Sequence, residues 1–253
     1  MSTLSQKLTA EALGTAILVF IGAGSVPLTI LLNGGDGVGG PAGLNNISFA
    51  FAFAIFAAIY SIGHISGCHI NPAVTLALLA TRKIDAPTAG AYIVAQVVGA
   101  FIGAGLTLII LTGNNPQTLG LGAVSFNPAT SGSLIALAAE IIGTAILVFT
   151  VFGSAVSGKA PAGFAGLAIG FIVYGIIILV GPITGAALNP ARQVGPPILE
   201  AVIGKTTDLS QLWVYIAGPI LGGLVGAFLY EFIGREVPAS VPSAVTAEAR
   251  AQG

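Results

Sequence analysis

The tripeptide Asn-Pro-Ala occurs twice before a short apolar run, at Asn71, Pro72 and Ala73 and again at Asn189, Pro190 and Ala191. An asparagine caps a helix through its side-chain oxygen, and proline fits the first helical position because its missing N–H would have no partner there. Each tripeptide therefore predicts a helix that begins at its asparagine. The amide N–H groups of both asparagines are then left to donate to an oxygen-bearing solute, while two positive helix-dipole ends beside them repel cations.

The residues in front of each asparagine add hydrogen-bond acceptors. The runs 67–70 and 185–188 are predicted to be non-helical, so their backbone carbonyls would form a row along a narrow path, kept slim by glycine and alanine. A metal site at the two histidines is disfavoured because no Asp or Glu cluster accompanies them. We instead predict that the histidines and four residues of the two runs line a pore: His64, Gly67, Cys68, His69, Gly185 and Ala187.

The composition places the chain in a membrane. Of its 253 residues, 55% are hydrophobic and only 7% are charged, whereas soluble chains are about 25% charged. The formal charge of −1 excludes a nucleic-acid binder that works by electrostatic attraction. The single cysteine, Cys68, cannot form an intrachain disulfide.

Six segments are long enough to cross a bilayer, which takes about 20 apolar residues. They are residues 8–31, 44–64, 87–112, 133–157, 163–181 and 209–234. Each tripeptide lies between two of them and starts only a short helix, Pro72–Thr81 or Pro190–Val202, and about ten residues at ~1.5 Å each cross half of a bilayer. We therefore predict two re-entrant half-helices packed against the spans. The pair Pro196 and Pro197 would shorten or kink the second one.

The chain is an internal duplication within one channel domain, residues 1–253. Residues 10–20 recur at 139–149 with nine identities in eleven, residues 65–73 match 183–191, and residues 92–104 are echoed at 215–227. Each half, about 5–115 and 130–235, holds three spans, so the second copy enters the membrane upside down. Inverted repeats of this kind place the functional site near the midplane, where broken helices meet.

Basic residues predict the orientation. Given six spans, most of them fall on one side, which the positive-inside rule makes the cytoplasm: Lys7, Arg82, Lys83, Lys159, Arg235 and Arg250. Both termini of this multi-pass cell-membrane protein are therefore expected in the cytoplasm. Residues 236–253 are predicted to be a disordered tail.

With these motifs the chain resembles the aquaporin and aquaglyceroporin family (major intrinsic proteins), over residues 5–235. The resemblance is carried by the segments 64–74 and 184–192. It implies an all-α membrane protein with a bundle of six tilted helices and two half-helices. It also implies a homotetramer with one pore per protomer, without cofactor or catalysis, through which water and small neutral solutes cross the bilayer.

The resemblance further implies an outer constriction formed by Phe51, Ile177, Ala186 and Arg192. Water-selective members commonly have histidine at the position of Ile177. Glycerol channels usually have Trp and Gly in this set and Asp after the arginine, where this chain has Phe51 and Gln193. The set is most similar to archaeal-type and some bacterial aquaporins. A passive water channel that excludes ions and protons is expected, and a glycerol or small-solute facilitator is the alternative.

Two buried carboxylates have a structural interpretation. Glu11 and Glu140 occupy equivalent repeat positions inside spans, where an ionisable residue is a functional candidate by default. The resemblance implies instead that they brace the pore loops by accepting backbone hydrogen bonds. An intramembrane hydrolase would need a nucleophile matched to Glu11 and His64, and a cation channel would need a ring of acidic residues; the sequence offers neither motif.

Two further residue patterns have simple predictions. A third Asn-Pro-Ala, residues 127–129, predicts a loop turn because no half-helix follows it. Cys68 stands three residues before Asn71, as Ala186 stands three before Asn189. The repeat therefore predicts that Cys68 faces the pore, where a mercurial would block it.

Overall fold

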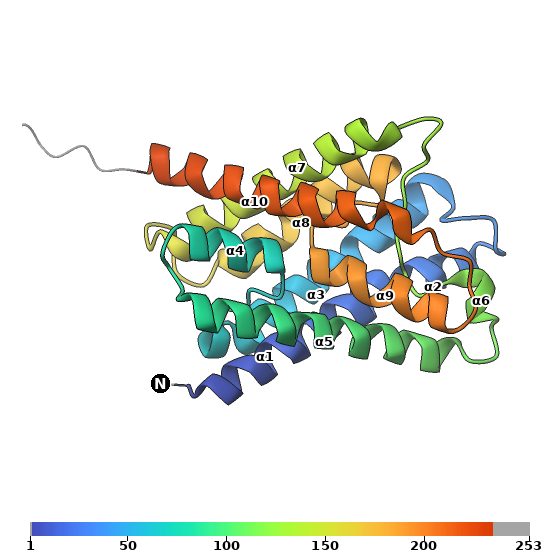
Figure 1. Ribbon diagram of the computed structural model, residues 1–253, viewed down its shortest axis with the longest axis horizontal. Helices are drawn as coiled ribbons and strands as arrows, with labels where there is room; N and C mark the ends of the chain where they lie inside the picture. The colour runs from blue at the N-terminus through green and yellow to red at the C-terminus, as the bar shows by residue number, and fades with distance from the viewer. Residues whose placement is uncertain (1, 235–253) are drawn as a thin grey trace, which may run out of the picture.

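The computed structural model describes residues 2–234, and all regular structure in that range is helical (Figure 1). Six helical stretches are long and apolar enough to span a membrane: Leu4–Leu32, Gly40–Ser66, Ala86–Leu111, Gly132–Val156, Ala165–Thr184 and Leu209–Ile233. The six predicted spans are therefore confirmed, with the largest shifts at the starts of the first two. The predicted tail from residue 236, together with Arg235 and Arg250, lies outside the described residues.

Residues 2–234 form ten α-helices and three other helical segments, which include the six spans and the two half-helices. The first repeat comprises α1 (Leu4–Ile17), η1 (Leu18–Ala23), α2 (Ser25–Leu32), α3 (Gly40–Ser66), α4 (Pro72–Ala80) and α5 (Ala86–Leu111). The short α6 (Pro116–Leu119) lies in the connection between repeats. The second repeat comprises α7 (Gly132–Val151), η2 (Phe152–Val156), α8 (Ala165–Thr184), α9 (Pro190–Val202), η3 (Leu209–Gln211) and α10 (Leu212–Ile233).

The half-helices α4 and α9 begin as their sequences predict. The side-chain oxygen of Asn71 accepts from the Ala73 N–H at 2.8 Å, and that of Asn189 accepts from the Arg192 N–H at 3.2 Å. The prolines inside α9 do not shorten it, since α9 has 13 residues and α4 has 9. The expected shortening is therefore wrong, and α9 continues through both prolines to Val202.

The two repeats interlock through their half-helices. In Figure 1, α4 and α9 lie between α10 and α5. Helix α4 packs mainly against α10 and α9 mainly against α5, so each half-helix packs on the last span of the other repeat. Within each repeat the first and last spans also pack closely, α1 on α5 and α7 on α10, and this close approach depends on glycine. A Cβ at Gly99 or Gly222 would clash with a backbone carbonyl of the facing helix, Ala12 or Ile141. Small residues at such crossings allow tight packing where lipid supplies no hydrophobic drive.

The perimeter of the bundle is apolar, as contact with lipid chains requires. Large side chains on several spans are more than half exposed, including Ile109 at 68%, Leu179 at 70% and Phe232 at 70%. A soluble protein would rarely expose so many. The start of α1 and the end of α10 lie at the same end of the bundle (Figure 1).

The third Asn-Pro-Ala forms an exposed turn. The side chain of Asn127 accepts from the Ala129 N–H at 2.9 Å, and its carbonyl accepts from the Ser131 N–H at 2.9 Å. No half-helix follows, and residues 128–131 are turn. The predicted loop turn is confirmed.

Candidate pore and constriction

A cavity of about 240 Å³ lies between the two repeats. Its walls include Phe51 and Arg192 near one end, Asn71 and Asn189 in the middle, and Lys83 beyond α4 at the other end. One water needs only ~10–15 Å³ of such space, so the cavity has room for a file of small molecules. The motif residues of both repeats therefore face one continuous path.

At the middle of this path the two asparagines tie the repeats together. The amide nitrogen of Asn71 donates to the carbonyl of Leu188 at 2.9 Å, and that of Asn189 donates to the carbonyl of Ile70 at 2.8 Å. Each amide has two N–H groups. The sequence predicts that the amide N–H groups of both asparagines donate to a solute. In the structure, one N–H of each amide bonds the other repeat, and the second N–H is left for the cavity.

The pore loops, residues 67–70 and 185–188, have an unusual backbone. Besides the glycine that starts it, each loop has two non-glycine residues with positive φ, with values of 50°, 43°, 48° and 54° at Cys68, Ile70, Ala186 and Leu188. Non-glycine residues rarely adopt this region, and each instance costs roughly 1–3 kcal/mol. Such strained loops persist only if other contacts hold them.

Glu11 and Glu140 supply those contacts. Both carboxylates are fully buried, and each accepts backbone N–H groups from the last two residues of one pore loop. The pairs are His69 N–H and Ile70 N–H to Glu11 at 2.9 and 2.7 Å, and Ala187 N–H and Leu188 N–H to Glu140 at 3.0 and 2.8 Å. Ser66 and Thr184 hydroxyls donate to the same two carboxylates at 2.7 and 2.6 Å. All these donors lie in a pore loop or directly before it. Each carboxylate therefore holds the conformation of one loop.

Arg192 is the charged residue of the four that the resemblance assigns to a constriction, and it is 1% exposed. Its Nη1 donates to the Gly122 carbonyl at 2.9 Å and to Gln193 Oε1 at 3.0 Å, and its Cζ lies 5.2 Å from the centre of the Phe51 ring. The Nε and Nη2 atoms have no partner among the described residues. Both atoms are buried in the structure, and Arg192 forms part of the cavity wall, so they are the donors that this side chain has left for a solute.

The constriction has an apolar counterpart in the other half of the cavity. The four positions assigned by resemblance, Phe51, Ile177, Ala186 and Arg192, all line the cavity. Applying the offset of 118 residues between the two tripeptides gives Ile169, Ile59, Cys68 and Val74, which also line it. The charge is therefore confined to one of two symmetry-related places.

Most of the cavity wall is apolar and comes from spans that carry no motif. Helix α3 lines the cavity with Phe51, Ile55 and Ile59, and α8 lines it with residues 169, 173 and 177 at the same spacing of four. This spacing presents one helix face. The 118-residue offset relates the two triplets and would have found the wall, had it been applied to the spans as well as to the loops.

Four predicted pore-lining residues lie on the cavity and two do not. Gly67, Cys68, His69 and Ala187 are in the wall. His64 is exposed and outside it, because a position five residues after Ile59 points well away from the face of α3 that meets the cavity. Gly185 packs against Val124, where a Cβ would clash. Within residues 2–234 no cluster of three or more metal-ligating side chains occurs.

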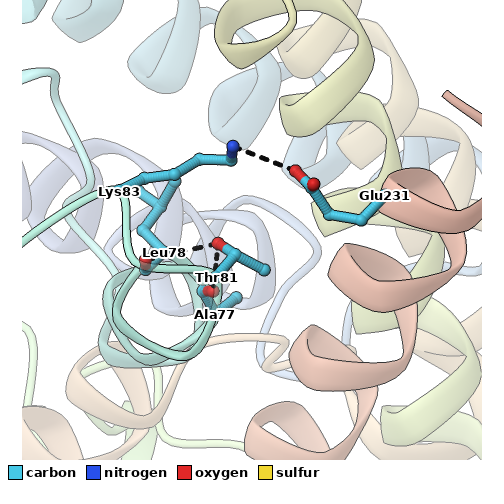
Figure 2. A network of polar contacts seen from close by, with 5 residues as sticks. All are labelled: Ala77, Leu78, Thr81, Lys83 and Glu231. Carbon is cyan, nitrogen blue, oxygen red and sulfur yellow. Dashed lines mark hydrogen bonds and ion pairs between the residues drawn. The ribbon is translucent and has the colours of Figure 1, made fainter. Parts of the chain in front are cut away.

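The end of the cavity beyond α4 is held by an ion pair (Figure 2). The chain leaves α4 through Arg82, whose φ is +60°, and the Lys83 N–H then donates to the Leu78 carbonyl at 2.8 Å. This turn directs Lys83 Nζ toward Glu231 on α10, at 3.0 Å. Lys83 and Arg192 are thus the two charged side chains of the wall, at opposite ends.

Known proteins are similar in sequence to this chain over nearly its whole length. The sequence model of the family described as "Major intrinsic protein" matches residues 1–230. Aquaporin AqpM of Methanothermobacter marburgensis is 40% identical over 93% of this chain and 100% of its own length. Probable aquaporin AqpM of Archaeoglobus fulgidus is 43% identical over 92% and 99%, and aquaporin Z of Rhodopseudomonas palustris is 37% identical over 96% and 99%. The fold is similar to that in the X-ray structure of the aquaglyceroporin from Plasmodium falciparum, with a TM-score of 0.80 and 27% identity over 90% of this chain and 96% of that one.

Proposed function

Because the chain belongs to the major intrinsic protein family, whose members are membrane channels for water and small solutes and not enzymes, we propose that it is a passive water channel that excludes ions and protons. One observation carries the proposal. The cavity wall is apolar except for a few fixed donors and acceptors, and its one charged constriction, at Arg192, keeps two donor nitrogens unpaired. This arrangement suits a small neutral molecule that can accept hydrogen bonds.

The mechanism follows from which molecules can replace their hydration in this path. Water exchanges its neighbours for the asparagine amides, the Arg192 N–H groups and the pore-loop carbonyls. A cation loses hydration and meets the Arg192 charge together with the N-terminal ends of α4 and α9. A water between Asn71 and Asn189 accepts from both amides. It therefore cannot also accept from the next water in the file, and the hydrogen-bond chain that a proton needs is broken there.

Stopped-flow light scattering on proteoliposomes tests the proposal. Water permeability should far exceed that of empty liposomes under an osmotic gradient, and glycerol permeability should be much lower. Glycerol flux comparable with water flux would favour the second candidate, a glycerol or small-solute facilitator. That candidate has one observation in its favour, since Ile177 leaves the constriction without the polar side chain that commonly narrows water-selective members.

A histidine at position 177 should sharpen selection against larger solutes. Ile177 is 3% exposed within the molecule and lines the cavity, so an imidazole there would occupy the path and add a polar group beside Arg192. In Ile177→His we expect residual glycerol flux to fall roughly tenfold while water flux persists, in line with the size of pocket-shape discrimination. Ile177→Leu is the matched apolar control and should keep the wild-type ratio. Unchanged glycerol flux in Ile177→His would remove position 177 from the selectivity filter.

Mercuric ion should block the channel through Cys68. The thiol lies in the cavity wall at the place equivalent to Ala186, so a bound mercury atom would narrow the path. Most of the water permeability should be lost in wild type and retained in Cys68→Ser. Adding Ala186→Cys to Cys68→Ser should restore the block from the other side of the midplane. Equal sensitivity of wild type and Cys68→Ser would mean that Cys68 is not the target.

We also propose that the channel is a homotetramer of the cell membrane with both termini in the cytoplasm. The apolar perimeter supports packing between protomers or against lipid. Lys83 and Lys159 line one small cavity, at the end of the bundle that holds both ends of the described chain. The positive-inside rule makes that end cytoplasmic.

A further inference from the structure

The residue that follows Arg192 lies outside the permeation path and yet contacts the constriction. Gln193 is 2% exposed and does not line the pore cavity. Its Oε1 accepts from Arg192 Nη1 at 3.0 Å and from the Val124 N–H at 3.2 Å, and its Nε2 donates to the Val124 carbonyl at 2.6 Å. The amide of Gln193 thus links the Arg192 guanidinium to the backbone of Val124, in the segment before α7.

That segment, residues 121–126, is held by three buried side chains of the second repeat. Glu200 accepts from the Leu121 and Ala123 N–H groups at 2.6 and 3.3 Å. Gln211 bonds both backbone groups of Phe126, at 2.9 and 3.1 Å, as Gln193 does at Val124. The backbone of 121–126 is therefore fixed almost residue by residue.

The fixed segment delivers one carbonyl to Arg192. Gly122 has a φ of +92°, and a Cβ there would clash with the Ala23 carbonyl, so only glycine allows the segment to pass this close to the first span. The Gly122 carbonyl accepts from the same Nη1 that donates to Gln193. A guanidinium is a rigid planar fork. Two acceptors on one nitrogen therefore set the plane of the whole group and the direction of its free Nε and Nη2 donors.

We propose that Gln193 is a positioning residue for selectivity, because it fixes the guanidinium plane of Arg192 and so sets the width of the constriction. The inference rests on the proposed channel function. Without the Gln193 oxygen, Nη1 keeps the Gly122 carbonyl as its one acceptor, and the guanidinium otherwise contacts only the face of the Phe51 ring at 5.2 Å. Fewer contacts then fix its orientation. A second cavity of about 300 Å³, lined by Gln193, Glu200 and Lys205 among others, lies on the other side of the Gln193 side chain.

The test compares three variants in proteoliposomes. Gln193→Met keeps the length of the side chain and removes its hydrogen bonds. The ratio of glycerol to water permeability should rise roughly tenfold, the lower end of the range for loss of a hydrogen bond to a charged group. Gln211→Met is the matched control, since it loses the same pair of bonds to the same segment without contacting Arg192, and its ratio should stay at the wild-type value. Gln193→Glu retains the acceptor and should return the ratio to within about twofold of wild type.

A second measurement does not depend on permeation. Modification of Arg192 by methylglyoxal in detergent, followed by mass spectrometry, reports how freely the guanidinium moves. Its rate should rise severalfold in Gln193→Met and stay unchanged in Gln211→Met. Equal behaviour of these two variants in both measurements would overturn the inference. Absence of water permeability in liposomes that contain the wild-type protein would refute the proposed function. The rates of Arg192 modification would then still decide the role of Gln193.

Discussion

Replacing Glu140 with leucine is expected to abolish water permeability and to lower the free energy of unfolding by about 3–5 kcal/mol, the usual cost of breaking a buried charged network. The carboxylate accepts the Ala187 and Leu188 N–H groups, which would be left buried and unpaired at roughly 1–3 kcal/mol each. The positive φ angles at Ala186 and Leu188 would then lack the contacts that hold them. Thermal unfolding in detergent and stopped-flow permeability measure the two effects.

Two variants separate the bracing role from the loss of a charge. Glu140→Gln keeps one acceptor oxygen and should show a smaller loss, about 1–2 kcal/mol. Glu231→Leu removes a carboxylate from a half-exposed ion pair with Lys83 and should cost at most about 1 kcal/mol. If Glu140→Leu were as stable and as permeable as Glu231→Leu, the pore loop would not depend on Glu140.

The parts of this fold that the sequence predicts are those recorded in length, hydropathy and repetition. A span must be apolar over about 20 residues, so six such runs are visible without a structure. The half-helices could be placed because an asparagine followed by a proline has few other uses ahead of a ten-residue apolar run. The duplication then required Asn71 and Asn189 to approach from opposite sides, and their bonds to Leu188 and Ile70 are the form that this approach takes.

What the sequence does not predict is the long-range pairing of backbone groups with single side chains. Leu121 and Glu200 are 79 residues apart, and Val124 and Gln193 are 69 apart. An irregular segment held this way has no periodicity, so residues 121–126 read as an ordinary connection. His64 lies outside the cavity wall for another reason, since proximity to a pore loop in sequence does not fix which face of α3 a residue occupies.

Replacing Arg192 with valine is expected to have the largest effect on selectivity while the fold is kept. Val74 occupies the equivalent place in the other half of the cavity, so valine is a side chain that this architecture already accommodates there. A unit charge at about 4 Å is worth ~4 kcal/mol at an effective dielectric constant of 20. Allowing for screening by water in the path, we expect proton or small-cation leakage to rise about tenfold or more, since ~1.4 kcal/mol is a factor of ten. A pH-sensitive dye inside proteoliposomes reports the proton flux.

The comparison with Arg192→Lys identifies which property of the arginine matters. Lysine keeps the charge and loses the planar fork that bonds Gly122 and Gln193 and presents Nε and Nη2 to the cavity. If charge is the barrier to cations, Arg192→Lys should keep the low proton permeability of wild type while its glycerol permeability rises. In Arg192→Val the permeability to both protons and glycerol should rise. Proton flux in Arg192→Val no higher than in wild type would place the ion barrier at the midplane, where the N-terminal ends of α4 and α9 meet, and would leave Arg192 with size selection alone.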